Sequence, residues 1–466
     1  MKRVLAILLT TVLLAAVVLT GCTPVAPSTG GSTGGQTTAP TKAPEPVKTE
    51  ATDDANVKVL NLWSFTNEIP NMLDKYKELN PSFNLEVKTT IIATTDGAYQ
   101  PALDQALAAG GADAPDIYAA ESAFVLKYTQ GDAAEYAAPY ASLGIDVANK
   151  LKEADIAQYT VDIGTRPADG QLVGLGYQAT GGALIYRRSL AKDTWGSDDP
   201  TVVKTKVGPG WDKYFAAAKD LKAKGYAIVS GDGDLWHAVE GASEKGWIVG
   251  GKLYIDPSRD AFLDQAKLLK DNAWHNDTQD WTDAWFADMK DAGPQKVFGF
   301  FGPAWLINYV MSPNAPETSG DWAVCEPPVG FFWGGTWVIA NKNTKIAKTV
   351  GDIIEWITLD SSKTGLQYFW ANGVMNDAGT KDTVASGTVM KVSDGTVPYL
   401  GGQNMFDAFV PAGAFATGKN KTQYDETINS YWRAVVREYA AGTKTREQAI
   451  KDFKQQVADN LDVVVE

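Results

Sequence analysis

Apolar and polar positions divide the chain into an apolar start, a polar stretch and a long body in which short strands alternate with helices. Val57 to Trp63 is an almost continuous apolar run, typical of a buried strand. The spacing predicts a helix over 70–79, a strand around 85–88, a helix over 99–109 and a short strand over 115–119. Strands that alternate with helices of this length predict an α/β fold with a largely parallel sheet.

The second half continues the alternation. Helices are predicted over 211–224, 256–272, 304–310 and 346–359, and strands over 227–230, 297–301, 321–324 and 336–339. Between them, Asp232-Gly233-Asp234 is interpreted as a polar loop before Trp236. The C-terminal part is predicted to be helical over 361–370, 424–441 and 445–461, and Thr445 with Gln448 forms a capping box for the last helix.

The first 21 residues have the features of a secretory signal. Lys2 and Arg3 precede an apolar run that ends in Leu19-Thr20-Gly21-Cys22. This ending resembles a bacterial lipobox, which implies cleavage before Cys22 and attachment of lipid to its thiol; the alternative is an uncleaved anchor helix. Residues 22–56 are rich in Pro, Gly, Thr, Ser and Ala, a composition that predicts a disordered tether.

Composition narrows the class of partner. The 466 residues carry a formal charge of −14 without a Lys/Arg-rich run, so we expect no nucleic-acid binding, which needs clustered cations. Anionic lipid would repel the chain, so membrane attachment is expected through the lipid on Cys22. Cys325 then has no disulfide partner, and its apolar neighbours predict a buried, inert thiol.

Motifs for catalysis and for metals are scarce, and we expect no cofactor. With only two histidines, a histidine-rich zinc site is excluded. Gly174-x-Gly176-x-x-Ala179 matches a dinucleotide fingerprint superficially, but a strand follows where that motif needs a helix. The glycines around Tyr177 instead indicate a crossing between two lobes, in which glycine absorbs hinge motion. Paired carboxylates for glycoside hydrolysis stay open as an alternative.

The positive signal is the chain's 15 tryptophans, many at strand ends and turns. A sugar ring offers an apolar face that stacks on an indole and a rim of hydroxyls that bind carboxylates and amides. Trp211, Trp247, Trp281, Trp322 and Trp356 are assigned to the core. The candidate ligand-binding residues are Trp63, Asn67, Glu68, Glu121, Tyr177, Trp236, Glu240, Trp305, Trp333, Trp337 and Trp370.

From Val57 onward the chain resembles the extracellular solute-binding proteins of family 1, the carbohydrate receptors of ABC importers. The resemblance rests on 57–63, on Ala108-Ala-Gly-Gly-Ala-Asp-Ala-Pro-Asp-Ile117, on the crossing 176–186, on Phe300-Phe-Gly-Pro-Ala-Trp305 and on Gly334-Gly-Thr-Trp-Val-Ile-Ala-Asn341. It implies a two-lobed periplasmic-binding-protein-like fold of type II with the ligand between the lobes. It also implies that Trp305 presents an aromatic ring to the ligand and that Glu121 contributes polar contacts.

Together these features predict a sugar or oligosaccharide receptor, not an enzyme, that closes about its ligand and delivers it to the transmembrane permease subunits of an ABC transporter. Lobe 1 is predicted to contain 57–178 and 330–360, and lobe 2 to contain 179–329 and 361–466. The hinge is placed at 177–182 and near 327–330. We expect a monomer, lipid-anchored at the outer face of the cytoplasmic membrane. The alternatives are a receptor of the same fold for a polyamine or a peptide, and a surface glycoside hydrolase. The tryptophan and the acid expected shortly after Asp116-Ile117 in maltodextrin receptors are not both matched, which argues against a maltodextrin ligand.

Overall fold

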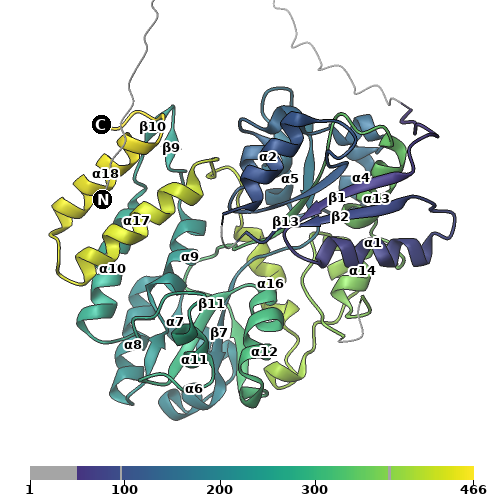
Figure 1. Cartoon of the computed structure of the whole chain (residues 1–466). Coiled ribbons are helices and arrows are strands. Elements are labelled where there is room, and N and C mark those ends of the chain that lie inside the picture. Colours follow the sequence, from purple (N-terminus) through teal and green to yellow (C-terminus); the bar gives the residue numbers. More distant parts are fainter. Residues whose placement is uncertain (1–49, 95–96, 376–378) are drawn as a thin grey trace, which may run out of the picture. The chain divides into compact units, whose positions relative to one another are not determined.

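The computed structural model describes residues 50–94, 97–375 and 379–466, all within the compact unit Val47–Glu466 (Figure 1). The predicted signal 1–21, the lipidation site Cys22 and most of the tether 22–56 lie outside the described residues. Within the described part, no helix combines the length and apolar character that a membrane span requires.

The first sheet has five strands in the order β2-β1-β3-β13-β6. Their bounds are β1 Val59–Ser64, β2 Glu86–Ile91, β3 Ile117–Glu121, β6 Gly174–Gly176 and β13 Thr336–Ala340. Strands β1, β2 and β3 are parallel, whereas β13 runs antiparallel to both β3 and β6. The early strands therefore form as the sequence predicted, but the sheet is mixed rather than largely parallel, because β13 enters it from the second sheet.

Helices cover this sheet on both faces. They are α1 Glu68–Leu79, α2 Tyr99–Ala109, α3 Val125–Thr129, α4 Val147–Ala154, α5 Gln158–Gly164, α13 Ala347–Thr358, α14 Leu366–Ala371 and α15 Gly387–Met390. The predicted amphipathic helix is α13, which buries Val350, Ile354 and Ile357. Helix α14 packs on α13, and α15 packs on α4. A short hairpin of β4 Thr165–Arg166 and β5 Gln171–Leu172 lies nearby in sequence.

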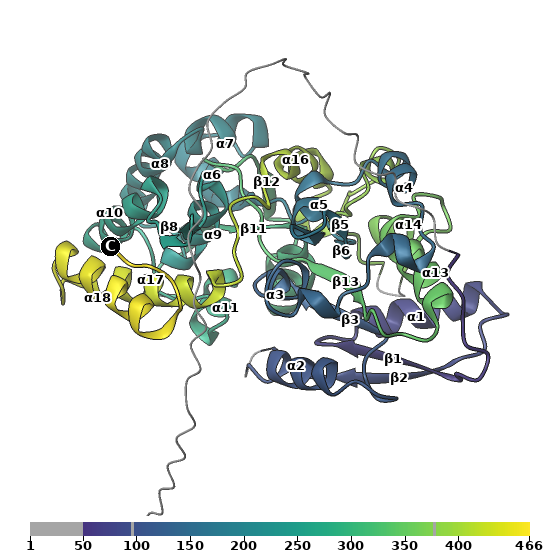
Figure 2. The same cartoon turned by 90° about the horizontal axis from the view of Figure 1, so that it is seen from above.

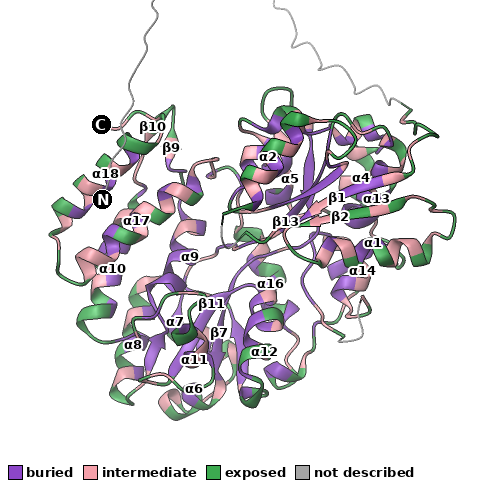
Figure 3. Ribbon diagram, in the orientation of Figure 1, coloured by how far each residue is buried: buried purple, intermediate pink, exposed green. Residues whose placement is uncertain are grey.

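The second sheet has the order β12-β7-β11-β8 and is completely buried (Figure 3). Its strands are β7 Ala183–Arg187, β8 Ala227–Val229, β11 Val297–Gly302 and β12 Trp322–Cys325; only β8 and β11 are parallel. The helices on this side are α6 Arg188–Trp195, α7 Pro200–Val207, α8 Trp211–Ala223, α9 Asp232–Ala242, α10 Pro257–Asp271, α11 Asp283–Met289 and α12 Ser312–Asn314. Strands β9 Ile248–Val249 and β10 Lys252–Leu253 form a separate hairpin.

Helix α9 corrects one prediction. The Asp232-Gly233-Asp234 stretch was interpreted as a loop, but it forms the first turn of the helix. Gly231 is the N-cap residue, and the side chain of Asp234 accepts a hydrogen bond from its backbone N–H at 3.2 Å. Acidic residues in a first turn also interact favourably with the helix dipole. Helix initiation therefore explains this acidic pair.

The last helices are α16 Phe406–Ala412, α17 Asp425–Ala440 and α18 Arg446–Asn460, and α17 packs between α10 and α18 (Figures 1 and 2). Half of the predicted capping box is present, because Thr445 Oγ1 accepts from Gln448 N–H at 3.2 Å. The Gln448 side chain donates to Asp452 instead of to the N-cap backbone. The buried thiol predicted at Cys325 is confirmed.

Where the chain passes between the two sheets, three extended segments lie side by side: 177–182, 331–333 and 383–385. The backbone N–H of Gly182 donates to the second segment at 2.9 Å, and the carbonyl of Tyr177 accepts from the third at 2.9 Å. The first was predicted as a crossing from its glycines, and the second was predicted near 327–330, just before the segment that makes these contacts. The third was not predicted, because nothing in its sequence distinguishes it from an ordinary loop.

Candidate ligand-binding site

Trp305 stands just past the end of β11, where the chain turns through Pro303 into a helical segment, Leu306–Met311. Its indole N–H donates to the carbonyl of Trp333 at 3.1 Å, and the two rings meet edge to face with centroids 4.8 Å apart. Gly334 has a φ of +75°, and a Cβ there would come within 3.3 Å of Trp305 Nε1. Glycine therefore lets the chain after Trp333 pass close beneath the indole.

Trp281 was assigned to the core, and that assignment is wrong. The side chain is 55% exposed and lies parallel to Trp305, with an interplanar angle of 7° and ring centroids 6.1 Å apart. Its backbone has a φ of +66°, a left-handed conformation that a bulky residue rarely adopts. Strained backbone of this kind is concentrated at functional sites. We call Trp281, Trp305 and Trp333 the tryptophan cluster.

A buried network of charged and polar side chains packs against this cluster. The His237 ring stacks on Trp333 at 3.6 Å between centroids, and its Nε2 lies 3.3 Å from Asp280 Oδ2. Arg433 donates to both oxygens of the same Asp280. Burial favours the neutral carboxyl, but His237 and Arg433 outweigh it and hold the pKa of Asp280 well below its usual value. The residue before Trp281 is therefore fixed as an anion.

Next to the cluster lies a pocket of about 250 Å³, lined by the end of β3, by helices α9 and α17 and by Trp333 of the cluster. Glu121 and Ser122, at the end of β3, face Glu240 on α9 and Lys421 across it. Lys421 donates to Glu240. Burial opposes ionisation of Glu240, but the charge of Lys421 outweighs it and lowers the pKa of the carboxyl to about 2. The Glu240 carboxylate is therefore ionised, and the charge of Lys421 balances it.

Glu121 is held by its own turn. Its carboxylate accepts from Ser122 Oγ at 2.9 Å and from the backbone N–H of Ala123 at 2.8 Å. Burial raises its pKa, and these hydrogen bonds oppose the rise. A carboxylate so oriented at the carboxyl end of a strand can accept a ligand hydroxyl.

Glu68 and Tyr177 meet at a second polar group. Tyr177 donates its hydroxyl to Glu68, the first residue of α1, and packs edge to face on Trp370 with centroids 5.6 Å apart. Asp382 is the third acidic or phenolic member of this region: besides its burial, the charge of Glu68 raises the pKa of Asp382, and a hydrogen bond with Trp370 opposes the rise. Burial raises the pKa of Asp382 to about 7, and burial likewise raises the pKa of Glu68. Asp382 was not among the residues predicted from the sequence.

Four other predicted residues lie elsewhere. Trp236, although it borders the pocket, is buried against Trp247 and Phe262. Trp337 is buried in β13 and donates its indole N–H to the Thr160 carbonyl at 3.1 Å. Trp63 is half-buried at the end of β1, and Asn67 is exposed beside α1. Ligand binding by these four side chains stays a prediction.

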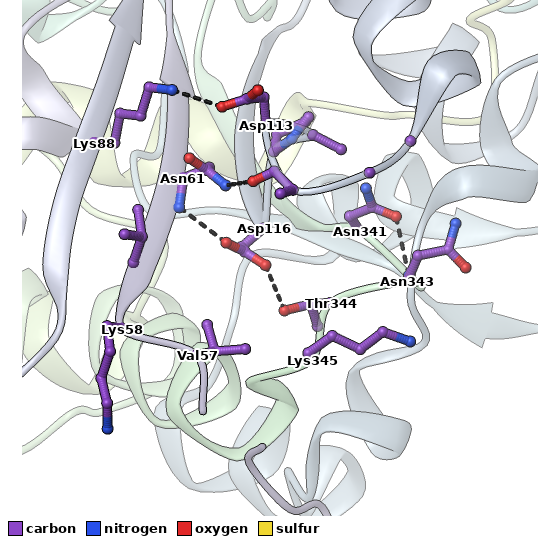
Figure 4. Close-up of a pocket in the computed structure, with 16 residues that line it drawn as sticks. Val57, Lys58, Asn61, Lys88, Asp113, Asp116, Asn341, Asn343, Thr344 and Lys345 are labelled. Atoms are coloured by element: carbon purple, nitrogen blue, oxygen red, sulfur yellow. Dashed lines mark hydrogen bonds and ion pairs between the residues drawn. The ribbon is translucent and has the colours of Figure 1, made fainter. Parts of the chain in front are cut away.

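A roomier hollow of about 710 Å³ lies at the amino ends of the parallel strands (Figure 4). There Asp116 accepts from the Asn61 N–H at 2.8 Å and from the Thr344 hydroxyl at 2.7 Å, and Lys88 pairs with Asp113. No aromatic side chain lines it, and ligands of such sheets bind at the opposite, carboxyl ends. These polar groups tie loops together, and we assign the site to the tryptophan cluster and its pocket.

The arrangement combines the exposed indole of Trp281 and the half-buried indoles of Trp305 and Trp333 with the carboxyl groups of Glu121 and Glu240, and it suits a ligand that has both an apolar face and hydroxyl groups. Among the described residues, no group of three or more His, Cys, Asp or Glu side chains is placed to hold a metal ion.

Solved structures of similar fold are solute-binding proteins. A crystal structure of an extracellular solute-binding protein of family 1 has a TM-score of 0.70 at 20% identity, covering 86% of this chain and 99% of the other. The galacto-N-biose/lacto-N-biose I-binding protein of Bifidobacterium longum has a TM-score of 0.66 at 17% identity, covering 89% and 100%. The sugar-binding protein MalE of Xanthomonas citri has 0.64 at 15%, covering 86% and 96%. The fold is thus the two-lobed α/β fold of periplasmic solute-binding proteins, as predicted.

The family model for bacterial extracellular solute-binding proteins matches residues 71–372. The chain belongs to this family. No curated protein sequence matches it.

Proposed function

We propose that the protein is a sugar receptor of an ABC importer that binds its solute at the tryptophan cluster. The single observation that carries the proposal is the parallel pair formed by the exposed Trp281 and the half-buried Trp305, next to a pocket lined by the carboxyl groups of Glu121 and Glu240. A pyranose ring stacks its C–H face on an indole while its hydroxyls donate to carboxylates, so both residue types must border one opening. The similar structures from B. longum and X. citri, described as binding lacto-N-biose and sugar, support this ligand class.

The proposed mechanism is binding by lobe closure, without turnover of the ligand. A solute that contacts both Glu121 on the first sheet and Trp305 on the second stabilises the closed state by its differential affinity, and the permease subunits read that state. The three crossing segments serve as the hinge. In this proposal, 361–391 moves with lobe 1, because α14 packs on α13 and α15 packs on α4.

The location is proposed from the sequence. Cleavage before Cys22 and lipidation of its thiol would leave 23–56 as a tether and place the receptor, as a monomer, on the outer face of the cytoplasmic membrane. Metabolic labelling with a fatty acid tests the anchor: label incorporated by the wild type and lost in Cys22→Ser supports it, and equal labelling refutes it.

A thermal-shift screen of the purified protein against mono- and oligosaccharides tests the sugar assignment, followed by calorimetry and product analysis of each ligand found. Stabilisation by a sugar that is recovered intact supports a receptor. We expect Trp305→Ala to weaken that sugar by about 1–3 kcal/mol through lost stacking area. Hydrolysis of an oligosaccharide at a saturable rate would establish a glycoside hydrolase instead, and unchanged affinity in Trp305→Ala would remove the cluster from the site.

A further inference from the structure

A separate cavity of about 200 Å³ lies where the first turn of α9, the C-terminal parts of α10 and α17 and the loop 275–279 come together. Helix α10 packs against both α9 and α17 (Figure 1). The loop follows β8, whose last residue, Val229, forms a parallel bridge with His275. We call this space the β8 cavity. It has no lining residue in common with the pocket beside the tryptophan cluster, as far as the described residues go.

His275 lines the β8 cavity with a ring nitrogen that the described residues do not complete. Its Nδ1 accepts from the backbone N–H of Asp277 at 2.9 Å, so the proton of the neutral ring is on Nε2. Burial lowers the pKa of the ring, which keeps it neutral at pH 7. The residue is 6% exposed, and Nε2 has no hydrogen-bond partner. A buried N–H without an acceptor is costly and calls for a bound species that completes it.

An ion pair in the same lining is also incompletely hydrogen-bonded. Arg437 donates from Nε to Asp232 Oδ1 at 3.2 Å and from Nη1 to Gln279 at 3.0 Å. Arg437 Nη2 and Asp232 Oδ2 are buried and have no hydrogen-bond partner among the described residues. Arginine and a carboxylate often form two parallel hydrogen bonds, whereas this pair forms one. One donor and one acceptor are therefore left over beside the donor of His275.

The charged side chains of the lining balance one another. Asp232 pairs with Arg437, Asp277 pairs with Lys270, and His275 is neutral. A cation would leave the two free N–H groups without an acceptor, and a fully ionised anion would leave Asp232 Oδ2 without a donor. A hydroxyl group both accepts and donates, so a neutral molecule with several hydroxyls completes all three atoms.

The rest of the lining distinguishes such a molecule from water. Three alanines, Ala266, Ala440 and Ala441, supply methyl groups to the cavity wall. Water would complete the polar atoms but would gain nothing from these methyl groups, whereas the C–H groups of a polyol bury apolar surface against them. The combination of unpartnered polar atoms and small apolar side chains therefore favours an organic molecule.

We propose that the β8 cavity is a second solute site, separate from the tryptophan cluster, which binds a small neutral polyol. Its hydroxyl oxygens accept from His275 Nε2 and Arg437 Nη2, and one hydroxyl donates to Asp232 Oδ2. These three atoms are covered in this structure, so entry requires the exposed side chains of Lys270 and Gln279 to move aside. The proposal does not depend on sugar binding at the tryptophan cluster.

Calorimetry on the full chain at pH 7 tests the assignment, with glycerol, erythritol, xylitol and myo-inositol as neutral probes and with phosphate and putrescine as charged probes. We expect at least one polyol to bind, and neither charged probe. Ala440→Leu fills the cavity without removing a polar group and should weaken that polyol by about tenfold or more. Ala434→Leu, at an exposed position on the same helix, is the matched control and should leave the affinity unchanged.

Two further variants make the result specific to this cavity. Asp232→Asn keeps an oxygen for Arg437 and replaces the free acceptor with an amide donor, so it should also weaken the polyol by about tenfold. Trp305→Ala, at the tryptophan cluster, should not change the affinity for the polyol. Thermal unfolding checks the fold of each variant, and Asp232→Asn decides the test if Ala440→Leu does not fold.

Three results would overturn the proposal. If the wild type binds none of the polyols, the cavity holds water only. Polyol binding that survives a folded Ala440→Leu or Asp232→Asn variant, or that is lost in Trp305→Ala, would place the polyol outside the β8 cavity. Phosphate or putrescine that binds the wild type and is lost in Ala440→Leu would show that the site takes a charged ligand instead of a neutral one.

Discussion

Replacing Trp281 by alanine should separate ligand affinity from stability. An aromatic side chain of this size buries roughly 150–250 Å² when it is fully covered. Because Trp281 is 55% exposed, roughly 100 Å² stays available to a ligand in the unliganded protein. At about 25 cal/mol per Å², a solute that covers one face, about half of this area, gains about 1.3 kcal/mol, close to tenfold in Kd.

The control for this prediction is a second tryptophan, Trp285, four residues further along the chain. Trp285 is buried, so Trp285→Ala should destabilise the fold by about 3–5 kcal/mol, whereas Trp281→Ala should change the free energy of unfolding by less than about 0.5 kcal/mol. Isothermal calorimetry with the sugar found by screening and urea unfolding measure the two quantities. A Trp281→Ala protein that binds the sugar as tightly as the wild type, or that is destabilised as strongly as Trp285→Ala, would refute the reasoning.

Three further outcomes follow from the packing and charges. Because the folded pKa of Glu240 is lowered to about 2, its pairing with Lys421 stabilises the fold above the unfolded value of about 4.3 and is lost as pH falls toward 2. Lys421→Met should therefore remove roughly 3 kcal/mol of stability at neutral pH and flatten the acid limb of a pH series of urea unfolding curves; an unchanged limb would contradict the pairing. Gly182→Ala should destabilise by about 1–3 kcal/mol in the same assay, since its Cβ would fall 2.0 Å from the Phe331 ring; a neutral effect would mean that the ring moves freely. With the other cysteine replaced by serine, Cys325 should react with a thiol reagent only in denaturant, because burial raises its pKa, and rapid reaction of the native protein would contradict this.

The parts of the site that the sequence predicted are those in which local pattern sets position. Trp305 follows an apolar run and a Gly-Pro turn, so its place at a strand end could be predicted. Glu121 ends β3 for the same reason. Trp236 was predicted to follow a loop, but it lies in helix α9. The small polar residues before it are as compatible with a loop as with the start of a buried helix. Its core neighbours, Trp247 and Phe262, belong to other segments.

The roles of other residues could not be predicted, because their charge state or position depends on partners far away in the sequence. Glu240 was selected for its proximity to Trp236, yet its charge state depends on Lys421, 181 residues later. Asp382 has no distinguishing neighbours in sequence, and it joins Glu68 only because the third crossing segment packs beside the first. Trp281 lies in a polar run, Thr278-Gln279-Asp280, which could have suggested exposure; its left-handed backbone, which directs the ring toward Trp305, has no sequence signal outside glycine and asparagine.

The crossing at 177–182 was predicted from its glycines, but the structure gives these glycines a different role from the one expected. They were interpreted as sites of dihedral freedom, but Gly181 and Gly182 do not have positive φ values. A Cβ at Gly181 would meet the Gly413 backbone at 2.6 Å, and one at Gly182 would enter the Phe331 ring. Their role in this state is therefore close approach between hydrogen-bonded segments. Left-handed glycines occur instead at Gly334 and Gly335, directly after Trp333, so the backbone freedom lies next to the tryptophan cluster. Because that turn also packs against Trp305, with a Cβ at Gly334 falling 3.3 Å from its indole nitrogen, larger residues there would displace the indole.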